Sequence, residues 1–109
     1  MVTRKYPRFS VSLSGTLLYK DQFRHAGAVL NLSAKGCRVT SIISPFTGMQ
    51  LTVQLHVPGE SKPIVINNAA VRWSSSAGIG LEFLTVAPPH QDRLDRMIQR
   101  LQPKTIPGK

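Results

Sequence analysis

The stretch from Met49 to Val57 alternates strictly between apolar and polar side chains. In a β-strand, successive side chains point to opposite faces, so this pattern collects every apolar side chain of the stretch on one face. A helix would scatter the same residues around its axis. The stretch therefore predicts a β-strand with one buried face, which requires neighbouring strands to pair with it. The apolar positions are Met49, Leu51, Val53, Leu55 and Val57.

Five other stretches predict strands, and only the C-terminal part of the chain predicts a helix. Turns rich in Gly, Pro, Ser and Asn separate the strands, which are expected at residues 11–19, 26–30, 37–40, 64–73 and 78–83. Within residues 88–102, apolar side chains recur with the spacing of one helix face, at Leu94, Met97, Ile98 and Leu101. Six short strands and a late helix indicate a mainly-β domain, either a small antiparallel barrel or a sandwich, with the helix packed on it. Phe83 is interpreted as a core residue, and Trp73 is interpreted as core packing, with a stacking platform as its alternative.

The chain is expected to form one domain over residues 1–103. Residues 1–8 are expected to be a mobile arm because they are polar and because Pro7 disfavours helix. Residues 104–109 are expected to be a disordered tail. The sequence contains no apolar run long enough to insert into a membrane, and we expect no secretory signal. With Cys37 as its single cysteine, the chain is expected to act in the reducing cytoplasm.

The net charge of +9 is concentrated towards the N-terminus. Residues 1–38 carry seven Lys or Arg against one acid, so this third of the chain is expected to attract anions. The three histidines stand far apart, and the five acids are not paired in a way that suggests acid–base catalysis. One cysteine cannot complete a zinc motif. We therefore expect no enzymatic activity, no metal and no bound cofactor.

Two short polar stretches offer binding chemistry. The first, residues 4–8, contains Arg4, Lys5 and Arg8, and arginine can hold a phosphate or the edge of guanine through two parallel hydrogen bonds. The second, residues 31–36, reads as a polar turn with Asn31 and Ser33 two residues apart. If this segment is extended, these two side chains share a face, and Gly36 permits close approach of a ligand. The simpler interpretation of the second stretch is an Asn/Ser turn that ends at glycine.

In this order and on this strand pattern, the two stretches resemble the motifs of the PilZ domain, a bacterial receptor module for the messenger cyclic di-GMP. The RxxxR motif falls on Arg4 and Arg8, and the (D/N)xSxxG motif falls on residues 31–36. The resemblance extends from about Arg4 to Leu101 and implies a six-stranded antiparallel β-barrel with a C-terminal α-helix. It also implies that the two arginines bind phosphate and guanine, while Asn31, Ser33 and Gly36 recognise guanine. Lys5 is counted with the arm, and Arg38 is either a further phosphate contact or a solvated strand residue.

The functional expectation is a stand-alone, non-enzymatic cyclic di-GMP receptor. On binding, its arm would become ordered over the barrel, and an unidentified effector protein would receive the signal. One alternative is a scaffold of the same fold that does not bind nucleotide. Another is a small basic barrel that binds single-stranded nucleic acid. Such sites need several exposed aromatic side chains as stacking platforms, and this chain has only seven aromatic residues.

Overall fold

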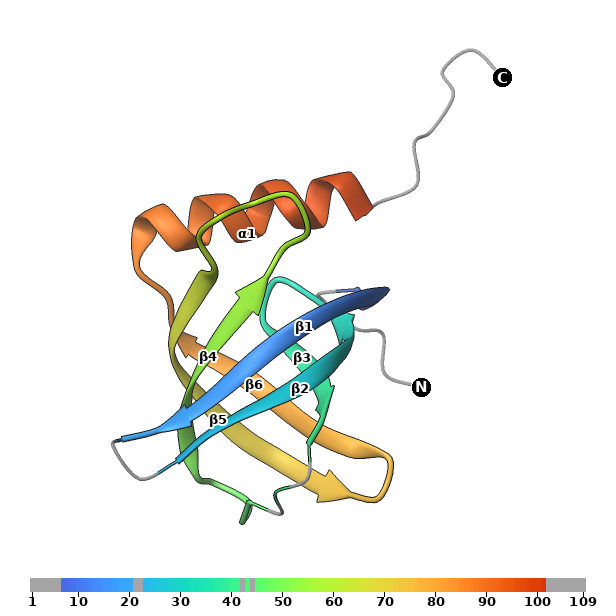
Figure 1. Cartoon of the computed structure of the whole chain (residues 1–109), viewed down its shortest axis with the longest axis vertical. Helices are drawn as coiled ribbons and strands as arrows, with labels where there is room; N and C mark the ends of the chain where they lie inside the picture. Colours follow the sequence, from blue (N-terminus) through green and yellow to red (C-terminus); the bar gives the residue numbers. More distant parts are fainter. Residues whose placement is uncertain (1–6, 21–22, 42, 44, 102–109) are drawn as a thin grey trace.

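The computed structural model describes residues 7–20, 23–41, 43 and 45–101. Six strands form a closed antiparallel barrel, and one helix lies across it (Figure 1). The strands are β1 (Phe9–Tyr19), β2 (Phe23–Leu32), β3 (Gly36–Thr40), β4 (Gln50–His56), β5 (Ile64–Ser75) and β6 (Gly78–Thr85), and the helix is α1 (Pro88–Leu101). The barrel, rather than the sandwich, is therefore confirmed. The proposed arm (except Pro7 and Arg8) and the proposed tail lie outside the described residues.

Around the barrel the strands follow the order β1-β2-β3-β6-β5-β4, and β4 pairs with β1 to close the sheet. The alternation that predicts β4 is present in the structure, where Leu51, Val53 and Leu55 are buried while the residues between them are partly exposed. The barrel interior is filled by aliphatic side chains. The largest that are fully buried are Leu17, Val29, Leu32, Val39, Leu51, Val53, Leu55, Ile64, Ile66, Ile79 and Leu81, together with Leu94 from the helix.

Strand β2 is longer than the sequence predicts. It runs over Phe23–Leu32 instead of residues 26–30. The additional residues include Arg24, which is exposed, and Asn31, which is partly exposed. Polar side chains on the outer face of a barrel do not interrupt a strand, although they do end an apolar run. Asn31 therefore belongs to the strand, and the predicted polar turn is confined to residues 33–35.

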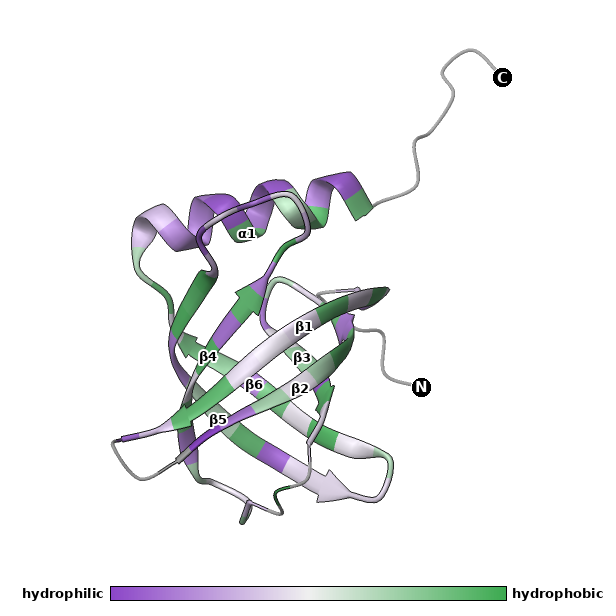
Figure 2. Cartoon of the chain, viewed as in Figure 1, coloured by the Kyte–Doolittle hydropathy of each residue, from purple (hydrophilic) through white to green (hydrophobic). Residues whose placement is uncertain are grey.

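Helix α1 packs on the barrel through the predicted apolar stripe. Leu94, Met97 and Ile98 are buried, and Leu101 packs against the same core at the last position of the helix. The remaining surface of the helix is largely hydrophilic (Figure 2). At the start of the helix, the backbone N–H of Val65 donates a hydrogen bond of 3.1 Å to Nδ1 of His90, which ties α1 to β5. No helix in the described part of the chain is both long and apolar enough to cross a membrane.

Candidate functional site

The two polar stretches found in the sequence meet at the ends of β1 and β2. Arg8 immediately precedes β1, and the β1–β2 register places Ser10 opposite Asn31. The Nη1 atom of Arg8 donates a hydrogen bond of 2.9 Å to the Oδ1 atom of Asn31, across 23 positions of the sequence. Both side chains are only partly buried. A cationic group and an amide are therefore held together at the surface of the barrel.

The turn between β2 and β3 is stabilised by Ser33. Its backbone N–H donates to the carbonyl oxygen of Gly36 at 2.8 Å, and its hydroxyl donates to the same oxygen at 3.3 Å. The hydroxyl also accepts a hydrogen bond from the backbone N–H of Lys35 at 3.1 Å. The residue is 3% exposed. In this arrangement the Ser33 side chain therefore shapes the turn that follows Asn31.

Gly36 lies where the turn approaches both β6 and Arg8. A Cβ atom at this position would collide with the carbonyl oxygen of Leu81 on β6 and would lie 3.3 Å from the Nη2 atom of Arg8. Only a residue without a side chain allows this approach. The glycine of the second motif therefore makes room both for the β3–β6 pairing and for the guanidinium of Arg8.

Strand register extends the site into a row of residues around the barrel. Asn31 on β2 lies opposite Arg38 on β3, Arg38 lies opposite Gly80 on β6, and Gly80 lies opposite Trp73 on β5. Directly opposed residues of antiparallel strands share one face of the sheet. The row lies on the outer face, because Asn31 and Arg38 are partly exposed and Trp73 is exposed.

Trp73 does not belong to the core, contrary to the interpretation of its sequence pattern. It is 40% exposed, whereas Phe83 is buried as expected. The indole of Trp73 lies so close over Gly80 that any Cβ atom there would collide with it. Because Gly80 has no side chain, the indole ring can pack directly on the backbone on the outside of the barrel. The signal for this arrangement is a glycine directly opposite an aromatic residue. It can be recognised only when the pairing register of β5 and β6 is known.

Arg38 contributes a further polar group that its neighbours leave unsatisfied. Its Nε atom is buried and has no hydrogen-bond partner among the described residues. A buried donor without a partner costs free energy, which an incoming acceptor would recover. Arg38 lies in the row between Asn31 and Gly80, so its side chain belongs to the same outer face.

Cys37 lies beneath this surface and is fully buried. Burial raises the pKa of its thiol to about 12, and the nearby positive charge of Arg8 partly opposes that rise. The thiol is therefore a neutral core group.

Of the residues predicted from the sequence, the structure brings together Arg8, Asn31, Ser33, Gly36 and Arg38. Arg4 and Lys5 lie outside the described residues. Trp73, for which core packing is the preferred interpretation of the sequence, is a further member of the row. Among the residues that the structure describes, no three His, Cys, Asp or Glu side chains lie close enough to hold a metal ion. The site therefore offers two guanidinium groups, an amide and an aromatic ring.

A six-stranded barrel with an arginine and amide surface at the β2–β3 turn is the architecture implied by the two motifs. The family model described as the PilZ domain matches residues 3–100, and the chain belongs to this family. A comparison with curated protein sequences finds no significant match.

Solved structures agree on the fold. The structure of the Bacillus subtilis inhibitor of motility, MotI/DgrA, superposes with a TM-score of 0.71 at 22% identity and covers 92% of this chain. This chain spans 51% of the length of MotI/DgrA. The PilZ domain of Escherichia coli YcgR, solved with c-di-GMP, gives a TM-score of 0.73 at 17% identity, with 92% of each chain covered.

A third structure, the PilZ domain of CeSA from a cellulose-synthesizing bacterium, gives a TM-score of 0.69 at 12% identity. It covers 87% of this chain and 97% of that domain. At these identities the likeness establishes a shared fold.

Proposed function

We propose that this chain is a non-enzymatic receptor for cyclic di-GMP. The observation that best supports the proposal is the hydrogen bond between Arg8 and Asn31, because it joins the two motifs at one place on the barrel surface. The presence of c-di-GMP in the structure of the YcgR PilZ domain, which has the same fold, supports the choice of ligand. The proposed ligand-binding residues are Arg4, Lys5, Arg8, Asn31, Ser33, Gly36 and Arg38.

The chemistry of these residues suits a ligand with two phosphates and two guanines. The cationic arm and Arg38 would neutralise phosphate charge, and a guanidinium can instead present its paired donors to a guanine edge. The amide oxygen of Asn31 accepts hydrogen bonds and would serve the N–H groups of guanine. Ser33 would support recognition by holding the turn, and Gly36 by keeping the approach open. Trp73 adds a ring on which a base can stack.

We further propose that ligand binding orders residues 1–8 over the barrel and that a partner protein in the cytoplasm reads the new surface. Ordering an arm costs conformational free energy. The phosphate and guanine contacts of Arg4 and Arg8 must therefore offset that cost. Hydrogen–deuterium exchange of the N-terminal peptide should slow when the ligand is added. Unchanged exchange in a saturated complex would contradict the ordering of the arm while leaving the binding itself in place.

Isothermal titration calorimetry of the full chain with cyclic di-GMP tests the binding, with GTP as the control nucleotide. We expect saturable binding at micromolar or tighter affinity for the cyclic dinucleotide and no comparable binding of GTP. A flat titration, repeated by equilibrium dialysis, would refute the proposal and favour a scaffold that does not bind nucleotide. A single-stranded oligonucleotide, titrated at low and raised salt, tests the nucleic-acid alternative, because phosphate-backbone binding falls steeply with salt.

A further inference from the structure

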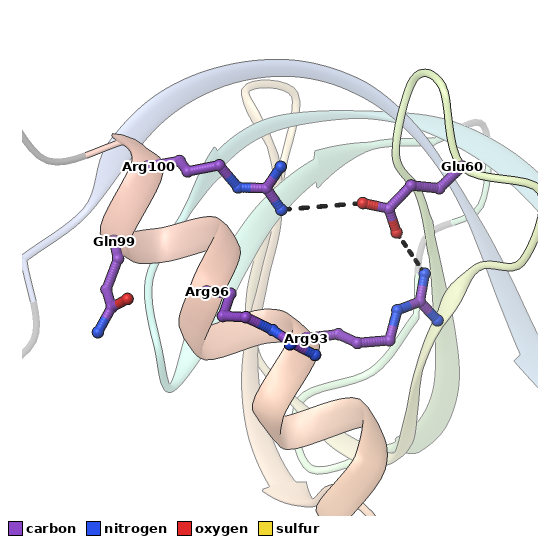
Figure 3. Close-up of a pocket in the computed structure, with 5 residues that line it drawn as sticks. All are labelled: Glu60, Arg93, Arg96, Gln99 and Arg100. Carbon is purple, nitrogen blue, oxygen red and sulfur yellow. Dashed lines mark hydrogen bonds and ion pairs between the residues drawn. The ribbon is translucent and has the colours of Figure 1, made fainter.

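A pocket separate from the row of residues described above lies between helix α1 and the turn that joins β4 to β5. It has a volume of about 850 Å³ and is lined by Glu60, Arg93, Arg96, Gln99 and Arg100. Figure 3 shows Arg93 and Arg100 pointing from the helix towards Glu60. Among the described residues, three guanidinium groups and one carboxylate therefore line this open pocket. We refer to this surface as the α1 arginine pocket.

Arg93 is the fixed part of the pocket. Its Nη1 atom donates to the carbonyl oxygen of Pro63 at 2.9 Å, and its Nη2 atom donates to the carbonyl oxygen of Lys62 at 2.6 Å. Its Nη2 atom also lies 2.6 Å from Oε1 of Glu60. With its side chain only 25% exposed, Arg93 joins the helix to the β4–β5 connection. The wall of the pocket is thereby preorganised before any partner arrives.

Glu60 shows what kind of group the pocket accepts. One oxygen of its carboxylate is bound by Arg93, and the other lies 3.8 Å from Nη2 of Arg100. The hydrogen bond from Arg93 lowers the pKa of Glu60, and the charges of Arg93, Arg100 and Arg96 add to that effect. An ionised carboxylate is therefore favoured at this place, and the molecule itself supplies one.

The single carboxylate leaves most of the positive charge in the pocket unmatched. Arg96 is exposed and makes no hydrogen bond or ion pair with the residues that the structure describes. Arg100 is 68% exposed, and its contact with Glu60 is long. Since Arg96 and Arg100 are four positions apart on one helix, their side chains lie on the same face. Two guanidinium groups are thus available to a second anionic ligand.

The lining of the pocket discriminates between kinds of anionic ligand. Among the residues that the structure describes, only charged and amide side chains line it, whereas sites for nucleotides and single-stranded nucleic acids rely on aromatic or apolar surfaces for the bases. Guanidinium groups match carboxylates in charge and in planar geometry. We propose that the α1 arginine pocket docks an acidic segment of a partner protein, in which Asp or Glu side chains bind Arg96 and Arg100. This assignment does not depend on the nucleotide site.

The experiment uses the full chain and a fluorescein-labelled hexaglutamate peptide, followed by fluorescence anisotropy at low salt. Hexaglutamine is the matched neutral peptide. We expect hexaglutamate to bind and hexaglutamine not to bind, and we expect the hexaglutamate affinity to fall as salt is raised. Failure of hexaglutamate to bind would overturn the proposal.

Three variants place the binding in the pocket. The double change Arg96→Gln and Arg100→Gln should lower hexaglutamate affinity by about fivefold or more, because two exposed ion pairs are lost. Arg24→Gln, which removes one exposed charge from β2, should have little effect. Glu60→Gln should raise affinity by about twofold or more, because the competing carboxylate is removed. Equal effects of Arg24→Gln and the double change, or weaker binding by Glu60→Gln, would overturn the assignment.

Two further measurements test whether the loss of hexaglutamate binding in the double variant is specific to the α1 arginine pocket. Circular dichroism should show the same helix content for the double variant as for the wild type, because Arg96 and Arg100 are exposed. Titration with cyclic di-GMP should be unchanged in the same variant, so that a failure of the nucleotide site is distinguishable from a failure of this one. If a single-stranded oligonucleotide binds more tightly than hexaglutamate and is lost in the double variant, the protein-segment assignment is wrong.

Discussion

The Arg8 guanidinium donates a hydrogen bond of 2.9 Å to the amide oxygen of Asn31. This contact spans the β1–β2 ladder, and it places the last residue of the RxxxR motif on the first residue of the second motif. Neither motif alone is specific. In the folded chain this contact joins the two motifs into one surface. The predictions for nucleotide binding depend on that surface.

Arg8→Ala should weaken cyclic di-GMP binding by about 1–3 kcal/mol, which is roughly one to two decades in Kd. The reason is the loss of a guanidinium able to make two hydrogen bonds to phosphate or guanine. Calorimetric titration measures the change, and Arg24→Ala is the matched control because it removes an exposed cation elsewhere on β2. Equal affinity of the Arg8→Ala and wild-type proteins would remove Arg8 from the site.

Trp73 should report ligand binding directly. It is the single tryptophan of the chain, it is 40% exposed, and it lies in the same row as Asn31 and Arg38. Stacking of a guanine on the indole should change the fluorescence of the protein as cyclic di-GMP is added. Trp73→Ala should weaken binding by about 1–3 kcal/mol, whereas Trp73→Phe should retain part of the affinity. A fluorescence signal that stays constant while calorimetry shows saturation would contradict base stacking at this position.

Gly36→Ala should destabilise the fold by about 1–3 kcal/mol, because the added methyl group collides with the carbonyl oxygen of Leu81. Urea unfolding gives the free energy of unfolding for both proteins. The comparison variant is Gly59→Ala, at a glycine with φ +85° and no atom within 4 Å of the new methyl group. It should cost about 1–2 kcal/mol, from backbone strain alone. A Gly36→Ala protein as stable as wild type would show that β6 can move away from the turn.

The burial of Cys37 predicts how stability depends on pH. Its pKa is raised from 9.0 to about 12 in the folded protein. Between these values the unfolded chain has lost the thiol proton while the folded chain keeps it. The unfolded state therefore binds fewer protons, and the free energy of unfolding falls as pH rises, by up to about 1.4 kcal/mol per pH unit.

Unfolding by urea at pH 8 and pH 10 measures this dependence, with Cys37→Ala to separate it from the titration of lysines. The wild type should lose more stability than the variant over this interval. At pH 8 the thiol of the folded protein should also react with a disulfide reagent far more slowly than the thiol of the unfolded chain. Identical pH profiles for the two proteins would mean that the thiol is accessible to solvent.

Much of the fold can be predicted from the sequence because it depends on local patterns of apolar and polar residues. In β4, every second residue is apolar and buried, as at Leu51, Val53 and Leu55. In α1, the apolar residues recur with the spacing of one helix face, as at Leu94 and Met97. The extension of β2 to Leu32 could not be predicted from the sequence. Strand residues with polar side chains on the outer face do not produce a hydrophobic pattern.

The candidate site is less predictable than the fold because register decides it. Motif spacing identifies Arg8, Asn31 and Gly36 as candidate binding residues. Whether they lie together depends on how β1 and β2 pair. The exposure of Trp73 depends on the glycine opposite it on β6, so the same apolar residue reads as core until its partner is known. The buried Nε atom of Arg38 likewise follows from three-dimensional packing.

The pairing of β4 with β1 has a consequence for how this protein can be recognised. Where a strand has a partner on each side, as β1 has over Ser14–Leu18, the closed sheet leaves no free row of backbone donors and acceptors. At those positions a partner cannot add a strand of its own. Recognition there must read side chains instead, and a change of sequence on the outside of the barrel or on α1 can alter the choice of partner while the backbone framework stays the same.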